Sequence, residues 1–140
     1  MLDESDTEVG GAVRDVVTLR LPAAGAYLSV LRSATAGLAA RLDFTLEEIE
    51  DLRIAVDEAC AMLLPDALPG AELACEFELG GDDFRITVSV PTSTGAEPNR
   101  DTFAWTVLSA LAGSVESRAA ADGTVSIDLH KRRTAGARAA

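Results

Sequence analysis

The chain has 140 residues, of which 48% are hydrophobic, and carries a formal net charge of −11. This length predicts a single globular domain, and the apolar content excludes a wholly disordered chain. The negative charge argues against direct binding of nucleic acid, because it would repel the phosphate backbone. No apolar run is long enough to cross a membrane and the N-terminus is acidic, so we expect a cytoplasmic protein that does not contact membranes.

The two ends of the chain lack the patterns of regular structure. Residues 1–14 mix acidic residues with glycine and serine, and residues 134–140 contain no large apolar side chain. We predict a flexible acidic tail at 1–14, one domain at 15–133 and a flexible tail at 134–140.

The domain begins with a predicted strand and helix. Apolar and polar residues alternate from Val16 to Leu21, the period of a half-buried strand, and Pro22 ends it. A stripe with the spacing of a helix follows, made of Tyr27, Val30, Leu31, Ala34, Leu38 and Leu42. Ser29 and Arg32 lie off this stripe.

A second helix has explicit start and stop signals. Thr45 and Glu48 form a capping box, and Pro65 ends the pattern. Between them the helical period is carried by Ile49, Leu52, Val56, Cys60 and Leu63.

Two alternating segments, 72–79 and 84–90, flank the turn residues 80–83 and predict a hairpin with one wet face. Residues 91–102 contain no large apolar side chain and predict a long surface loop. A helix at 103–111 and a strand at 124–130 complete the pattern. We therefore expect an α+β two-layer sandwich, with helices packed on one face of a mixed, mainly antiparallel sheet.

Cys60 and Cys75 stand apart without a metal-binding spacing, and His130 is the single histidine. This excludes a structural zinc site, and we predict no metal site. Two buried, reduced thiols are the favoured interpretation, and a redox switch is the alternative.

The segment Leu52-Arg53-Ile54-Ala55-Val56-Asp57-Glu58-Ala59-Cys60 resembles the N-box helix of RsbW-type anti-sigma factors. These are serine-protein kinases of the GHKL superfamily, which has the histidine-kinase-like (Bergerat-type) ATPase fold. The resemblance covers roughly 15–133, and the segment 123–132 is similar to the last strand of the family. The segment 103–111 resembles a divergent actinobacterial branch.

The resemblance implies a homodimer that holds an alternative sigma factor of the stress or development type inactive. It also implies release of that sigma factor by an anti-anti-sigma protein of the STAS type. In the family the first helix contributes to partner contact, so Ser29 and Arg32 are the candidate partner-binding residues. Two ordinary solvent-facing side chains are the alternative interpretation.

The resemblance assigns Glu58 as the candidate catalytic base of a kinase, and a vestigial, solvated carboxylate is the alternative. Four residues later the kinases place an asparagine that binds Mg²⁺, but this chain has Met62. A thioether is a soft ligand that suits Mg²⁺ poorly, so we expect Met62 to serve helix packing.

The two glycine-rich motifs of the family are also altered. Thr92-Ser93-Thr94-Gly95 stands where an aspartate would bind adenine, and no glycine occurs from 96 to 112. Phe103 and Trp105 are expected to fill the vacated nucleotide pocket. No nucleotide-binding residue is therefore assigned, although ATP with Mg²⁺ could bind if the altered site keeps some affinity.

Together these features favour an anti-sigma factor that acts by binding, a pseudo-kinase without phosphate chemistry. The alternative is an active serine-protein kinase that uses ATP to phosphorylate the anti-anti-sigma protein. A scaffold or dimerisation domain with neither activity is a third interpretation.

Overall fold

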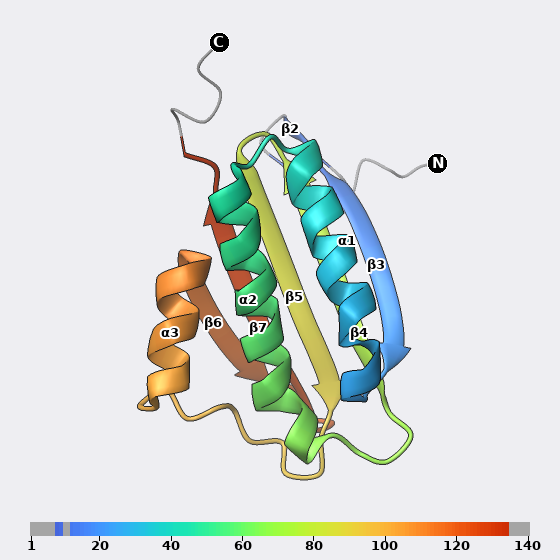
Figure 1. The fold of residues 1–140 in the computed structure, drawn as a ribbon. Helices are drawn as coiled ribbons and strands as arrows, with labels where there is room; N and C mark the ends of the chain where they lie inside the picture. The colour runs from blue at the N-terminus through green and yellow to red at the C-terminus, as the bar shows by residue number, and fades with distance from the viewer. Residues whose placement is uncertain (1–7, 10–11, 135–140) are drawn as a thin grey trace, which may run out of the picture.

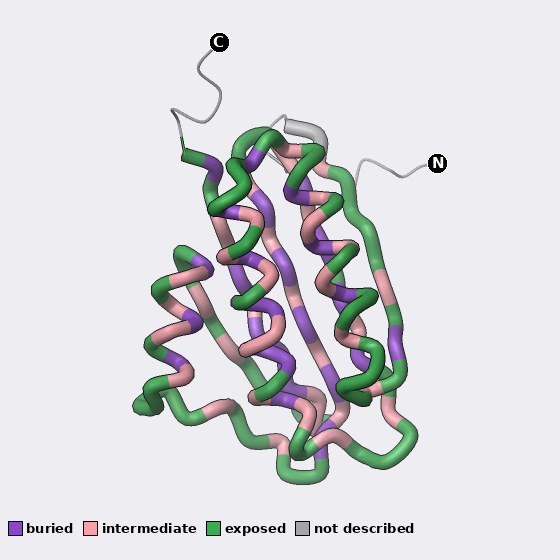
Figure 2. Tube along the Cα trace, viewed as in Figure 1, coloured by how far each residue is buried: buried purple, intermediate pink, exposed green. Residues whose placement is uncertain are grey.

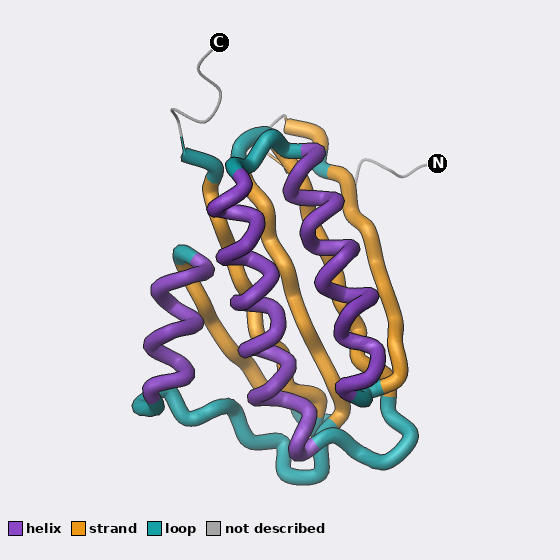
Figure 3. The backbone as a smooth tube through the Cα atoms, viewed as in Figure 1, coloured by secondary structure: helices purple, strands orange, loops and turns teal. Residues whose placement is uncertain are grey.

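The computed structural model describes residues 8–9 and 12–134. Three helices cover one face of a five-stranded sheet, as Figure 1 shows. This arrangement confirms the expected α+β two-layer sandwich. The secondary-structure view in Figure 3 shows the same two layers, with the loops gathered at the two ends of the helices.

The strands are β1 (Glu8–Val9), β2 (Ala12–Val13), β3 (Asp15–Pro22), β4 (Glu72–Gly80), β5 (Asp83–Pro91), β6 (Ser114–Ala119) and β7 (Thr124–Arg132). The helices are α1 (Leu28–Arg41), α2 (Leu46–Leu63) and α3 (Phe103–Ala112), with short 3₁₀ turns η2 (Gly25–Tyr27) and η3 (Leu64–Asp66). The main sheet has the order β3-β4-β5-β7-β6, and β1 pairs with β2 alone. The expected sheet is mixed and mainly antiparallel, and every ladder between the described strands is antiparallel.

The centre of the sheet follows the alternation in the sequence. Along β4 and β5 every second residue is buried beneath the helices, and Figure 2 shows these buried positions in purple. Phe77 of β4 and Phe84 of β5 are fully buried, and their rings stack with centroids 6.0 Å apart. Such pairs add about 0.5–1.5 kcal/mol to the free energy of burial. The hairpin therefore anchors the core.

Helix α2 begins where the sequence predicts. The Glu48 backbone N–H donates to Thr45 Oγ1 over 3.1 Å, and the Thr45 N–H donates to Glu48 Oε1 over 2.8 Å, so both halves of the capping box are formed. The helix lies between α1 and α3 (Figure 1) and continues into η3, which contains Pro65.

Helix α1 differs from its predicted burial. The sequence places Tyr27 and Val30 on the apolar stripe, but they are 44% and 47% exposed. Thr35 is fully buried instead, and its hydroxyl donates to Leu31 O over 2.8 Å. Because that bond satisfies the hydroxyl, a polar residue can face the sheet at little cost. The buried face of α1 is therefore rotated from the one that the apolar residues indicate.

Strand β6 is not predicted by the sequence pattern. It pairs with β7 at the edge of the sheet, and none of its residues is fully buried. Within the part of the chain that is described, no helix is long and apolar enough to cross a membrane.

Candidate functional site

Glu58, the candidate base, lies in the second half of α2 and is partly exposed. Its neighbour Asp57 pairs with Arg32 of α1. Successive residues of a helix are turned by about 100°, so Glu58 points away from that contact. No ion pair or side-chain hydrogen bond joins Glu58 to any other described residue. Its carboxylate is therefore accessible.

Met62 lies one helical turn beyond Glu58, so the two residues share a side of α2. Its side chain is partly buried and packs against the hydrophobic core. The sulfur is the one donor atom of this side chain, and it suits Mg²⁺ poorly. This packing agrees with the expectation from the sequence that Met62 serves the helix interface.

The loop that follows β5 uses Thr92 for its own structure. Thr92 is buried, its hydroxyl donates to Gly123 O over 2.8 Å, and the same oxygen accepts from the Gly95 N–H over 2.7 Å. Gly95 has φ +64°, a left-handed conformation that suits glycine. The hydroxyl that stands in place of the expected aspartate is thus already used as a donor and as an acceptor. It presents no free anionic acceptor for an adenine amino group.

The loop also meets a carboxylate that the sequence did not reveal. Asp66, in η3, accepts from the Ser93 N–H at its backbone oxygen over 2.9 Å, and from Thr94 Oγ1 at its carboxylate over 3.4 Å. No spacing rule connects Asp66 with a loop nearly 30 residues later. Only the fold, which brings the end of α2 against the end of β5, places them together.

The start of α3 is closed by its own cap. Thr102 Oγ1 accepts from the Trp105 N–H over 3.1 Å, and Trp105 is buried in the core. The Arg100 guanidinium lies 5.2 Å from the centroid of the Trp105 ring, a cation–π contact. The threonine therefore occupies a helix terminus that could otherwise bind a phosphate.

The expectation that two aromatic residues fill the pocket is wrong for Phe103. This residue is 82% exposed at the first turn of α3, whereas Trp105 is only 8% exposed. The two positions differ by two residues and so lie on opposite sides of the helix. Phe103 is consequently an exposed apolar group beside the loop, which runs below α2 and α3 in Figure 3.

The two candidate partner-binding residues have different surroundings. Ser29 is exposed on α1, whereas Arg32 is partly buried and pairs with Asp57 of α2. One nitrogen, Arg32 Nη1, lies 2.9 Å from Asp57 Oδ1 and 3.1 Å from Oδ2. Arg32 thus joins two helices, a role that the sequence did not indicate. Its pairing also connects the outer face of α1 with the residue next to Glu58.

The two thiols lie in the core. Cys60 of α2 and Cys75 of β4 are both fully buried and unlinked. Burial raises the pKa of Cys60 to about 12, with smaller contributions from Cys75 and Asp57, and burial raises the pKa of Cys75 to about 12. Neither thiol forms a reactive thiolate at neutral pH.

Comparison with known proteins gives consistent relatives, although no family model matches the chain. The anti-sigma-F factor RsbW of Mycobacterium tuberculosis is 32% identical over 116 residues, which are 81% of this chain and 69% of that protein. The serine-protein kinase RsbW of Bacillus pumilus is 35% identical over 80 residues, 54% of this chain. That match spans about half of the Bacillus protein, 49% of its length.

A solved structure supports the fold. The RsbU and RsbW domains of Rv1364c from Mycobacterium tuberculosis match 85% of this chain with a TM-score of 0.67 and 16% sequence identity. The match covers 32% of that longer chain. On the sequence similarity to its mycobacterial relative, the chain belongs to the RsbW family of anti-sigma factors and serine-protein kinases.

Proposed function

We propose that this chain is an anti-sigma factor that acts by binding and has no kinase activity. It would sequester an alternative sigma factor in the cytoplasm and release it to an anti-anti-sigma protein of the STAS type. Family membership supports the regulatory role. The observation that carries the loss of catalysis is the packing of Met62 against the core, one turn from Glu58.

Mg²⁺–ATP does not fit the residues present. A thioether replaces the expected metal ligand, the Thr92 hydroxyl is used by its own loop, and Thr102 caps the start of α3. Each feature removes a donor or acceptor that phosphoryl transfer needs for positioning. The loss of these three binding features outweighs the presence of Glu58.

Calorimetric titration with ATP and Mg²⁺ tests this part of the proposal. We expect no saturable heat for the wild type or for Glu58→Ala. Met62→Asn would restore a hard oxygen ligand, so it reports whether the metal ligand alone is missing. Saturable micromolar binding to the wild type would contradict the proposal.

Active kinase function is the second candidate, because Glu58 is accessible and free of partners among the described residues. A kinase would transfer phosphate from ATP to a serine of the STAS-domain protein, and loss of transfer in Glu58→Ala would identify the base. We expect no such transfer. Incubation of the chain with labelled ATP and the STAS-domain proteins of the same genome separates the two functions.

The binding surface would include the exposed side of α1. Tyr27 of η2, Val30 of α1, and Val16 and Val17 of the edge strand β3 are exposed apolar residues. Helix α1 and strand β3 lie at the same edge of the molecule (Figure 1). Exposed apolar groups of this kind are typical of protein interfaces, and they support both a homodimer and a sigma-factor contact.

Arg32 and its partner provide a matched test of that surface. If Arg32 contacts the sigma factor, Arg32→Ala should weaken the complex by about 2 kcal/mol. Asp57→Ala removes the same intramolecular ion pair but keeps the arginine, so it should not weaken binding. Equal losses in both variants would assign Arg32 a structural role only. Absence of binding to every sigma factor of the same genome would favour a scaffold.

A further inference from the structure

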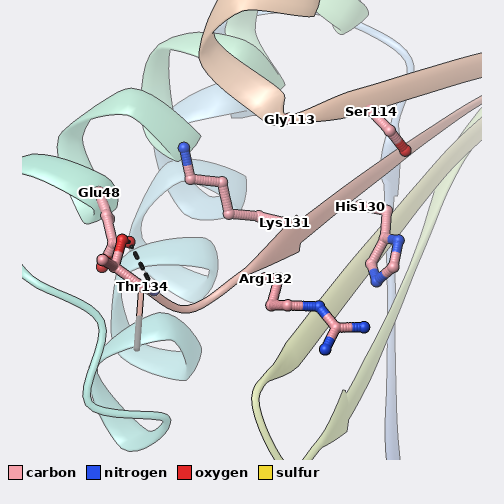
Figure 4. Close-up of a pocket in the computed structure, with 7 residues that line it drawn as sticks. All are labelled: Glu48, Gly113, Ser114, His130, Lys131, Arg132 and Thr134. Carbon is pink, nitrogen blue, oxygen red and sulfur yellow. Dashed lines mark hydrogen bonds between the residues drawn. The ribbon is translucent and has the colours of Figure 1, made fainter. Parts of the chain in front are cut away.

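We propose that the open end of β7 is a second binding site, for a short extended acidic segment of a partner protein. A cavity of about 460 Å³ lies at this end and is lined by Glu48, Gly113, Ser114, His130, Lys131, Arg132 and Thr134 (Figure 4). Glu48 lies in the first turn of α2 and Glu58 lies ten residues later, so about 15 Å of helix separates this cavity from the candidate base. The site is therefore distinct from the one described above.

The strand edge at this cavity has no neighbouring strand among the described residues. The ladder between β6 and β7 ends at the pair Ser114 and His130, whereas the ladder between β5 and β7 continues to the pair Asp83 and Arg132. Beyond His130, no described strand pairs with β7 on the β6 side. An exposed strand edge of this kind can accept an added strand from another chain.

The backbone of β7 presents its groups in the direction that such an added strand requires. The Arg133 N–H donates to Asp82 O on the β5 side over 2.7 Å. Because N–H groups alternate in direction along a strand, the Arg132 N–H points to the open side. Main-chain hydrogen bonds to Arg132 would contribute affinity whatever the side chains of the bound peptide are.

Gly113 lies where the ladder between β6 and β7 ends. It has φ +88°, and a Cβ at this position would lie 2.9 Å from His130 O. The glycine allows the chain to leave α3 and enter β6 tightly against β7. Gly113 therefore permits the close approach of β6 to β7 at the pair where their ladder ends.

The charge of the cavity specifies an acidic occupant. Lys131 and Arg132 contribute two positive charges, of which Arg132 pairs with Asp83 of β5. Glu48 contributes one negative charge that is already held by hydrogen bonds from Thr45 and Thr134. The whole chain, by contrast, carries −11. The lining thus carries more positive than negative charge, in contrast to the whole chain, and would attract an acidic segment.

The two cations lie on opposite faces of the strand. Figure 4 shows Lys131 extending toward the helices, while His130 and Arg132 extend to the other side of β7. Lys131 Nζ donates to Leu111 O over 3.2 Å, which leaves two of its three donors. The Arg132 side chain is 71% exposed, and its Nε lies 3.5 Å from Asp83. Two adjacent acidic side chains of an extended peptide point to opposite faces, so they would meet one cation on each face.

Titration of the full chain with two synthetic peptides tests the site. One probe is an extended hexapeptide with two adjacent aspartates flanked by valines, and the other has lysine in place of each aspartate. We expect saturable binding of the acidic peptide alone. The amide resonances of Gly113, Ser114, Lys131 and Arg132 should move on binding.

The variant Lys131→Gln/Arg132→Gln should weaken this binding by at least about tenfold. The matched control is Arg20→Gln/Arg118→Gln, which removes the same charge from two side chains that are 63% and 62% exposed elsewhere on the sheet. This control should bind as the wild type does, and circular dichroism checks that both variants fold. No saturable binding, equal weakening in both double variants, or amide shifts confined to other residues would each overturn the proposal. None of these outcomes depends on nucleotide or sigma-factor binding.

Discussion

Thr134 donates both its backbone N–H and its hydroxyl to one oxygen of Glu48, a residue 86 positions earlier in the chain. The two contacts measure 3.2 Å and 2.6 Å to Glu48 Oε2, and the other oxygen of the same carboxylate completes the cap of α2. Next to Thr134, Arg133 is buried and donates to Leu42 O over 2.6 Å. One carboxylate thus joins the start of α2 to the end of the domain.

Replacement of Glu48 should destabilise the domain. Glu48→Ala removes the acceptor for three donors, and we expect the free energy of unfolding to fall by about 1–2 kcal/mol. Glu47→Ala is the control, because Glu47 is an exposed acid in the same helical turn. Urea unfolding followed by circular dichroism measures both changes. Equal losses would show that only the charge near the helix terminus matters.

The same carboxylate should give stability a pH dependence. Burial acts to raise the pKa of Glu48, but hydrogen bonds from Thr134 and Thr45 outweigh it and lower the pKa below its usual 4.5. Its contribution is therefore fully present above pH 4.5 and is lost as the pH falls through the lower, folded-state pKa. The stability difference between wild type and Glu48→Gln should shrink below pH 4.5. A difference that stays constant down to pH 3 would contradict this assignment.

Two glycines should respond in opposite directions to the same substitution. Gly113→Ala forces a Cβ to within 2.9 Å of His130 O at φ +88°, and we expect a loss of about 1–3 kcal/mol. Gly37 lies inside α1, and a Cβ at this position would meet nothing within 4 Å. Gly37→Ala should therefore stabilise the domain by about 0.5–1 kcal/mol. Thermal melting of the two variants provides the measurement, and a shift of the same sign in both would refute the argument.

The ion pair between Arg32 and Asp57 should contribute little to stability. Their side chains are 34% and 38% exposed, and pairs of this exposure are worth about 0.2–1 kcal/mol. A double-mutant cycle with Arg32→Ala and Asp57→Ala measures the coupling directly. A coupling above about 2 kcal/mol would mean that the pair is a principal link between α1 and α2.

The two cysteines should resist alkylation in the folded protein. A pKa of about 12 leaves almost no thiolate at pH 8, and both side chains are fully buried. We expect labelling by iodoacetamide only after unfolding, with mass spectrometry counting the modified thiols. Rapid labelling of Cys60 or Cys75 in the native protein would favour the alternative interpretation, in which the cysteines form a redox switch.

The sequence was most informative where a short pattern of residues is typical of one kind of element. The capping box of Thr45 and Glu48 and the alternation in the β4–β5 hairpin predicted the elements that form. It was least informative for β6, which carries one large apolar residue, Val115, because an edge strand needs little burial. The strands β1 and β2 lie in the segment expected to be a tail. Each has only two residues, so the sequence shows no alternating apolar pattern there.

The site was harder to predict than the fold because its contacts join distant segments. The poor fit of a thioether to Mg²⁺ correctly assigned Met62 to helix packing. No feature of the sequence showed that Arg32 meets Asp57 or that Asp66 meets Thr94. The prediction that Phe103 fills the nucleotide pocket rested only on the size of its side chain. The exposure of Phe103 depends on how α3 is oriented against the sheet, and the residue types in the segment do not specify that orientation.

The strand order has a consequence for how the chain assembles. β3 pairs only with β4 in the sheet, and α1 and α2 separate the two strands along the chain. By contrast, β4 and β5 form a local hairpin, and local contacts form early in folding. We therefore expect the amides of β4 and β5 to become protected from hydrogen exchange before those of β3. During synthesis, α1 and α2 would leave the ribosome before β4 and β5, so their apolar faces would stay unpacked until the strands of the sheet are made.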